Sequence, residues 1–147
     1  MEESLEKKIS LNPPVKTPHE VSSLYSPLSL AYIGDSIYDL KVKNFVVSSG
    51  NMQPEKYHRI VTGIVSANSQ SEFIKDYMDN LSEDELAVYK RARNSSPHTK
   101  AKNASLQDYL MATGFEAVLG FLYLSGQHDR LDEIITQSLI FRGVIKV

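Results

Sequence analysis

Cysteine is absent from this chain of 147 residues. Neither a disulfide framework nor a thiolate metal site can therefore hold the fold together, and an intracellular location is the more economical expectation. Long apolar runs are also missing, since no stretch approaches the roughly 18 uninterrupted apolar residues that a membrane-spanning helix requires. The opening stretch MEESLEKKISLNPPVKTP is polar and charged and contains no apolar segment of signal-peptide length. We therefore expect a cytoplasmic protein with no membrane partner.

Net positive charge is lacking as well. The 16 lysines and arginines are outnumbered by 18 aspartates and glutamates, so the formal net charge is −2. The overall charge gives no sign of nucleic-acid binding, and any such function must come from positive charge gathered on one surface. A metal site built from histidines is not indicated either, because the four histidines are scattered and no HExxH or similar spacing occurs.

The chain does contain the material for one hydrophobic core. With 41% hydrophobic residues, it can bury a proper core but has little room for a second domain. Residues 1–24 mix charges with Pro13, Pro14 and Pro18, which disfavour a long helix there. We expect a loosely ordered N-terminal arm over residues 1–24 and one domain over residues 25–147.

Helix signals fill residues 25–147, whereas no segment alternates between apolar and polar residues at period two for long. Ser26 and Pro27 are typical of an N-cap and a first helical position, and Ser82 with Glu85 forms a capping-box pattern. The expected helices are Pro27 to about Ser48, one from Pro54, one from Ser66 or Asn68 to Asp79, one after Ser82, Leu106 to Leu124, and the stretch DRLDEIITQSLIF. The sequence therefore predicts an all-α fold, a helical bundle.

The stretch LAYIGDSIYDL places Asp35 directly after Gly34 inside a nearly apolar helical run. Four apolar residues recur there at helical spacing and form a stripe that we expect in the core: Leu30, Ile33, Ile37 and Leu40. Glycine costs roughly 1 kcal/mol of helix propensity relative to alanine, so Gly34 indicates close approach of another backbone or of a ligand. For this helix alone, an ion pair or solvent contact explains Asp35 as well as a functional role does.

A second helix repeats this pattern in ATGFEAVLGFLYL, where Glu116 is the only charged residue and Gly114 and Gly120 flank it. If the two helices meet, their carboxylates could share a hard cation that offsets desolvation and mutual repulsion. Magnesium suits such a site, because it accepts one or two carboxylates and completes its shell with water and phosphate oxygen. Periodicity does not show that the helices meet, so a helical protein-interaction module with internal ion pairs stays an alternative.

Both stretches resemble the catalytic domain of the ribonuclease III family. YIGDSIYDL is similar to the signature helix of that family, and FEAVLGFLYL is similar to the later helix that carries a metal-binding glutamate. The stretches GIVSANSQSEFI and YKRARNSS, with the absence of a double-stranded-RNA-binding domain, bring the resemblance closest to the Mini-ribonuclease III group over about residues 25–140. The resemblance implies an all-helical homodimer that cleaves double-stranded RNA with magnesium. It also implies 5′-phosphate product ends and precursor 23S ribosomal RNA as the substrate.

Carried over residue by residue, the resemblance implies that Asp35 and Glu116 are the catalytic and magnesium-binding pair. Ala31 and Thr113 occupy positions where ordinary ribonuclease III has two further acids, so a four-acid or two-metal site is not implied. Asp39, one helical turn after Asp35, is a candidate additional metal ligand, although an ordinary surface carboxylate is the favoured interpretation. The missing acids also leave open a catalytically inactive module that binds structured RNA or a ribosomal particle.

Positive charge gathers between residues 90 and 102, where no acid occurs. The candidate RNA-binding residues are Lys90, Arg91, Arg93, Asn94, Lys100 and Lys102. The cations would contact phosphates, and the shape and 2′-hydroxyls of A-form RNA would distinguish it from DNA. Charge alone favours a solvated helix end that complements the helix dipole, and it is the resemblance that favours RNA. Lys56, His58 and Arg59 form a smaller second candidate.

Overall fold

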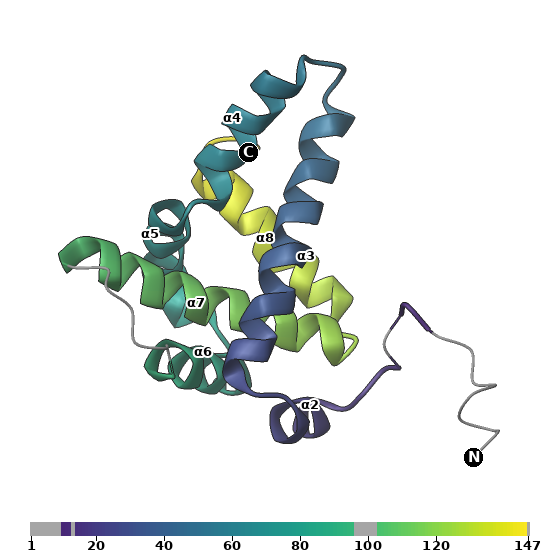
Figure 1. Ribbon diagram of the computed structural model, residues 1–147, viewed down its shortest axis with the longest axis vertical. Coiled ribbons are helices and arrows are strands. Elements are labelled where there is room, and N and C mark those ends of the chain that lie inside the picture. Colours follow the sequence, from purple (N-terminus) through teal and green to yellow (C-terminus); the bar gives the residue numbers. More distant parts are fainter. Residues whose placement is uncertain (1–9, 13, 96–102, 147) are drawn as a thin grey trace.

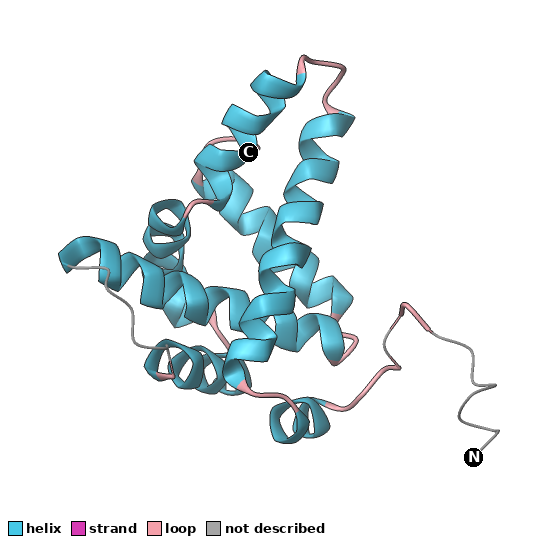
Figure 2. Ribbon diagram, viewed as in Figure 1, coloured by secondary structure: helices cyan, strands magenta, loops and turns pink. Residues whose placement is uncertain are grey.

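The computed structural model describes residues 10–12, 14–95 and 103–146 of the chain. The regular elements within these ranges are all helices, and none of them is a strand (Figure 2). The prediction of an all-α fold is therefore confirmed. None of the helices in this part of the chain is long and apolar enough to cross a membrane.

Two helices of 22 residues each cross at the centre of the molecule, and shorter helices surround them (Figure 1). The central pair is α3 (Pro27–Ser48) and α7 (Asn103–Leu124). The surrounding elements are α4 (Pro54–Val65), α5 (Ala67–Tyr77), the 3-10 turn η1 (Met78–Asn80), α6 (Glu83–Asn94) and α8 (His128–Phe141). Helices α5 and α6 contact α7, whereas α4 contacts α3. The expected helices are thus present with boundaries that differ by a few residues.

Short-range capping signals decide where α5 and α6 begin. Ser82 and Glu85 form the expected capping box, with distances between nitrogen and oxygen of 3.1 and 2.9 Å. Ser66, not Asn68, is the N-cap of α5, because its hydroxyl accepts a hydrogen bond from the backbone N–H of Ser69. Each cap gives a partner to a backbone N–H that the helix itself leaves unpaired, which typically contributes about 1 kcal/mol.

A short helix, α2 (Pro18–Leu24), lies inside the segment that we expect to be loosely ordered. Thr17 and Glu20 form a reciprocal capping box, and the proline at the first helical position fits this start. The side chain of Val21 is fully buried against the core. A helix of this length has little stability by itself, so its packing through Val21 holds it in place. The prolines exclude a long helix here but permit a short one.

The crossing of α3 and α7 leaves no room for a side chain at two glycines. A Cβ atom on Gly34 would overlap the carbonyl oxygen of Glu116, and one on Gly120 would overlap the carbonyl oxygen of Leu30. The two backbones are therefore in direct contact, which confirms the close approach that Gly34 predicts. Because Asp35 follows Gly34 and Glu116 supplies the facing carbonyl, this contact also brings two carboxylate-bearing positions together.

The apolar stripe predicted on α3 is only partly buried. Leu30 and Ile37 are 1% and 9% exposed, but Leu40 is 54% exposed. The prediction that Leu40 belongs to the core of the single chain is wrong, because Leu40 lies on the opposite side of α3 from Tyr38 and Val42, whose side chains are buried. Two other large apolar side chains of α3 share this exposure: Tyr32 at 81% and Val47 at 54%. Helix α3 thus presents an uncovered apolar face.

Candidate active site

The crossing of α3 and α7 places the side chains of Asp35 and Glu116 next to each other. Asp35 is exposed to solvent, and Glu116 is half-buried. Burial is the largest cause that raises the pKa of Glu116 to about 8, and a hydrogen bond from Gln70 opposes this rise. The negative charge of Asp35 and a side-chain hydrogen bond between the two acids raise the same pKa further. The two acids therefore form one anionic site, half of which opens to solvent.

A buried amide contacts Glu116 from α5. The side chain of Gln70 is 2% exposed, and its Nε2 donates to Glu116 Oε2 at 3.1 Å and to the backbone carbonyl of Val65 at 2.8 Å. Acid and base patterns do not reveal this residue, since an uncharged amide gives no such signal. The available clue is the helical register, which places Gln70 on the same face as the buried residues Phe73 and Ile74.

The chemistry of the carboxylate pair fits magnesium. Carboxylate oxygens are hard donors, and Mg²⁺ commonly takes one or two of them while it keeps several waters. A cation between Asp35 and Glu116 would offset the repulsion that contributes to the raised pKa of Glu116. Within the described ranges, no group of three or more histidine, aspartate or glutamate side chains could hold a metal ion. Asp35 and Glu116 are the residues that would hold the ion.

The candidate additional ligand Asp39 is paired with a lysine of its own helix. Asp39 forms an ion pair with Lys43 at 2.8 Å, and both line an apolar cavity of about 480 Å³ between α3 and α4. This i,i+4 pair is the surface arrangement that helix spacing favours. Among the residues that the structure describes, neither Asp35 nor Glu116 forms a salt bridge. Asp35 and Glu116 thus do not make, with the described residues, the internal ion pairs that the interaction-module alternative assigns to them.

The C-terminal turns of α6 carry those candidate RNA-binding residues that the structure describes. Three of the candidate RNA-binding side chains are exposed: Lys90, Arg91 and Asn94. Arg93 is half-buried, and its guanidinium carbon lies 5.5 Å from the centre of the Tyr89 ring. That ring packs against Gly114 of α7, where an added Cβ would lie 2.6 Å from ring atoms. The basic end of α6 is therefore seated on the helix that carries the buried carboxylate, whereas Lys100 and Lys102 lie outside the described residues.

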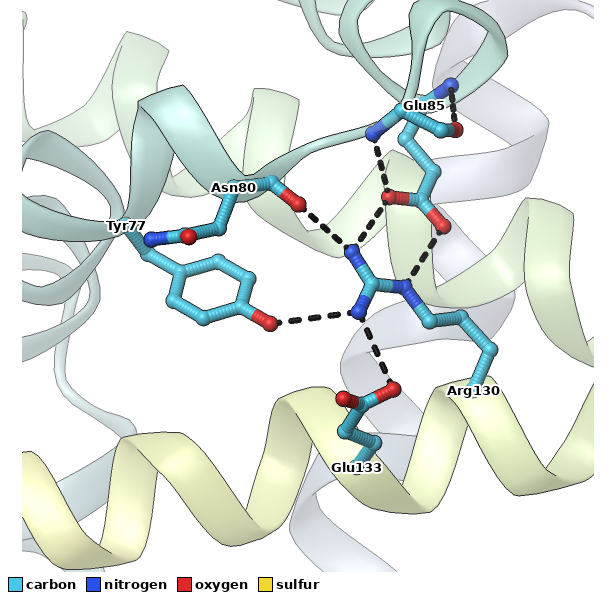
Figure 3. A network of polar contacts seen from close by, with 6 residues as sticks. Tyr77, Asn80, Glu85, Arg130 and Glu133 are labelled. Carbon is cyan, nitrogen blue, oxygen red and sulfur yellow. Dashed lines mark hydrogen bonds and ion pairs between the residues drawn. The ribbon is translucent and has the colours of Figure 1, made fainter.

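One arginine ties the start of α6 to α8 (Figure 3). Arg130 donates two hydrogen bonds of 2.9 Å to the carboxylate of Glu85, and others to the carbonyl of Asn80 and the hydroxyl of Tyr77. Burial raises the pKa of Glu85, but its hydrogen bonds, above all those from Arg130, outweigh burial and hold the pKa below its usual value. Such a bidentate pair fixes orientation as well as distance. Helix α6 and its basic residues are therefore held in one orientation.

The sequence matches the Ribonuclease III domain family over residues 28–127, a range that contains nearly all of α3 and the whole of α7. The chain belongs to the ribonuclease III family. Mini-ribonuclease 3 of Clostridium tetani is 45% identical over 111 residues, which are 75% of this chain and 74% of that relative. Mini-ribonuclease 3 of Enterococcus faecalis is 43% identical over 110 residues, 74% of this chain and 83% of that relative.

A crystal structure of a protein from Fusobacterium nucleatum has the same fold as this member of the ribonuclease III family. That protein is 27% identical, with a TM-score of 0.74 over 86% of this chain and 98% of the other. The resemblance seen in YIGDSIYDL and FEAVLGFLYL is thereby confirmed. Family membership and the names of the relatives support an endoribonuclease, which is a hydrolase.

The two positions at which the sequence resemblance implies missing acids are buried in the structure. Ala31 and Thr113 are 7% and 6% exposed. The hydroxyl of Thr113 donates a hydrogen bond of 2.9 Å to the carbonyl of Tyr109, one turn earlier on α7. Neither side chain therefore adds a charged group to the pair of Asp35 and Glu116.

The raised pKa of Glu116 predicts how stability changes with pH when no metal is bound. Glutamate ordinarily titrates near pH 4.5, whereas Glu116 in the folded chain has a pKa of about 8. Between these pH values the folded state binds a proton that the unfolded state has lost. The free energy of unfolding should therefore fall as pH rises and level off above about pH 8. Each pKa unit corresponds to about 1.4 kcal/mol.

Thermal unfolding of wild type and Glu116→Gln in EDTA, between about pH 5 and pH 9, measures this effect. We expect the Tm of the variant to rise relative to wild type with increasing pH, because the amide does not ionise. In a chain of this size, about 1 kcal/mol shifts Tm by about 2–4 °C. Addition of Mg²⁺ should reduce the difference in Tm between the variant and wild type, because the ion binds to folded wild type and stabilises it. If the Tm values of wild type and Glu116→Gln changed in parallel with pH in EDTA, the raised pKa of Glu116 would be contradicted.

Proposed function

We propose that this member of the ribonuclease III family is a magnesium-dependent endoribonuclease that hydrolyses phosphodiester bonds of double-stranded RNA. The observation that supports it most is the pairing of Asp35 with Glu116 at the crossing of α3 and α7. Two mutually repelling carboxylates, one exposed and one half-buried, suit a hard cation that also contacts a phosphate oxygen. The resemblance to Mini-ribonuclease III supports precursor 23S ribosomal RNA as the substrate and the cytoplasm as the location.

Asp35 and Glu116 would hold magnesium through their carboxylate oxygens. When bound, the ion supplies the Lewis acidity that activates water and offsets the charge that develops on the phosphate oxygens. Asp35 lies on the solvent side, from which RNA approaches, whereas Glu116 is anchored on the central helix α7. Hydrolysis of the phosphodiester then leaves a 5′-phosphate and a 3′-hydroxyl.

Incubation with a structured double-stranded RNA separates this proposal from its alternatives. The wild-type protein should cleave the duplex in Mg²⁺ but not in EDTA, should leave a DNA duplex of the same sequence intact, and should produce 5′-phosphate ends. Asp35→Asn should lose the activity. Binding of RNA without cleavage by folded wild type would instead favour the catalytically inactive module. If folded wild type neither bound nor cleaved the RNA, the protein-interaction module would be favoured.

The exposed end of α6 is our proposed RNA-binding surface, together with residues 100 and 102. Replacement of both Arg91 and Arg93 with glutamine should weaken RNA binding and make it less dependent on salt. Each lost phosphate contact reduces the salt slope by about one, because fewer counterions are released on association. At saturating RNA most of the turnover should return, since the carboxylate pair is untouched.

Filter binding at several salt concentrations measures the affinity and the slope of this double variant. Because Arg93 also packs on Tyr89, the folding of the variant must first be compared with wild type. The matched comparison is replacement of Lys56 and Arg59 with glutamine, which removes the smaller basic cluster. If that pair lowered the slope while the α6 variant bound normally, the phosphate contacts would belong to α4.

We also propose that the protein is a homodimer whose two copies meet at the uncovered face of α3. Large apolar side chains are rarely left exposed together on a monomer, and this face continues into the apolar cavity between α3 and α4. A two-fold dimer is the commonest closed assembly for a surface that meets its own copy. The second copy would cover Tyr32, Leu40 and Val47.

Replacement of Leu40 with aspartate should convert the dimer to a monomer. The side chain is 54% exposed in the single chain, so the change should disturb assembly more than the fold. Leu24→Asp is the matched control, because Leu24 is 63% exposed but belongs to α2 and not to α3. Sedimentation of the three proteins measures assembly. A monomeric wild type at concentrations where it cleaves RNA would contradict the dimer.

A further inference from the structure

Gln70 is an uncommon kind of residue in this core, a fully buried amide. It lies in the first turn of α5, and its side chain is 2% exposed. Burial of an amide is unfavourable unless hydrogen bonds replace those lost to water. Gln70 makes two such bonds, one to the backbone of Val65 and one to Glu116.

The partners of Gln70 fix which way its amide points. The carbonyl oxygen of Val65 can only accept, so the atom 2.8 Å from it must be the amide nitrogen. The second hydrogen of that nitrogen then faces Glu116 Oε2 at 3.1 Å. Rotation of the amide by half a turn would place two acceptors against each other. Gln70 is therefore a donor to Glu116.

The oxygen of the same amide is left unsatisfied. Gln70 Oε1 is buried and has no hydrogen-bond partner among the described residues. An orphaned acceptor of this kind costs about 1–3 kcal/mol, so an apolar side chain of similar volume would serve packing better. What the amide provides, and an apolar side chain would not, is the contact with Glu116.

We propose that Gln70 is a positioning residue that holds the Glu116 carboxylate in the orientation that magnesium requires. The inference rests on the proposed function of the carboxylate pair. Oε2 of Glu116 accepts the hydrogen bond from Gln70. The other carboxylate oxygen of Glu116 can therefore point toward a cation that is shared with Asp35. Val65 is the last residue of α4, so Gln70 braces the carboxylate of α7 against the junction of α4 and α5. Outer partners of this type commonly change metal affinity by about 10–100-fold.

Gln70→Met tests the proposal, because methionine keeps the volume but removes both donors. We expect the apparent affinity for Mn²⁺, followed by electron paramagnetic resonance without RNA, to fall by about 10–100-fold. Cleavage should weaken at limiting Mg²⁺ and recover toward the wild-type rate at saturating Mg²⁺, whereas Glu116→Gln should not recover. Gln70→Asn, which keeps the amide but is one methylene too short to span both partners, should weaken Mn²⁺ binding in the same direction and replaces Gln70→Met if that variant does not fold.

Ser71→Ala is the matched control, since Ser71 is equally buried but donates to Met111 and not to Glu116. It should bind Mn²⁺ as wild type does. Wild-type Mn²⁺ affinity and Mg²⁺ dependence in folded Gln70 variants would overturn the positioning role. Failure of the proposed function is a different result, because wild type would then cleave no RNA while the Mn²⁺ measurement still reports on Gln70.

Discussion

Glu116→Gln is expected to lower the turnover of RNA cleavage by about three orders of magnitude while the fold and the assembly persist. Glutamine keeps the size of the side chain and its place beside Gln70, but it loses the anionic oxygen that a hard cation requires. The charge that Mg²⁺ would stabilise in the transition state is then left uncompensated. The fold should survive, because the change removes a half-buried acid that is repelled by its neighbour.

Single-turnover rates at saturating RNA and Mg²⁺ measure this loss directly. The matched control is Asp39→Asn. The carboxylate of Asp39 lies one turn from Asp35 and forms an ion pair with Lys43. That variant should stay within a few-fold of wild type. A comparable loss in Asp39→Asn would make Asp39 part of the metal site. A folded Glu116→Gln protein with wild-type turnover would remove the basis of the assignment.

Gly34→Ala should strongly destabilise the fold, although it adds only one methyl group. The added Cβ would overlap the carbonyl oxygen of Glu116, and that atom belongs to a helix backbone that cannot turn aside as a flexible side chain can. Helices α3 and α7 would have to separate, which we expect to lower the free energy of unfolding by about 3 kcal/mol or more. The same displacement would move Asp35 away from Glu116, so activity should fall together with stability.

Gly63→Ala provides the comparison for this variant. Gly63 also lies within a helix, α4, but an added Cβ there would meet no atom within 4 Å. Alanine should therefore stabilise that helix by about 0.5–1 kcal/mol. Urea unfolding monitored by circular dichroism gives both values. Equal stabilities of Gly34→Ala and wild type would show that the helices are not in backbone contact.

The sequence predicts those parts of the fold that neighbouring residues encode. The capping box of Ser82 and Glu85 needs only four consecutive positions, and the long helices follow from their apolar period. Gly34 gives more than local information, because the weakness of glycine in a helix is itself a sign of a close neighbour. The prediction that another backbone or a ligand approaches closely at this point could therefore be made before the partner was known.

Features that depend on long-range contacts are not predictable in this way. Leu40 fits the apolar stripe as well as Ile37 does, and only the placement of the other helices around α3 decides that one is buried and the other exposed. Gln70 meets Glu116 across 46 positions in the chain, and an uncharged amide gives no chemical signal of such a partner. Periodicity places a residue on a face of a helix but does not say what lies opposite.

The direct backbone contact between α3 and α7 also has a consequence for biosynthesis. Helix α7 follows α3 only after four other helical elements, so the crossing cannot form until α7 has been synthesised. Contacts between such distant segments close late, after the individual helices have formed. A nascent chain that has folded as far as α6 carries Asp35 but not its partner. If the carboxylate pair has the proposed role, the growing polypeptide would therefore be unable to cut the RNA that surrounds it on the ribosome.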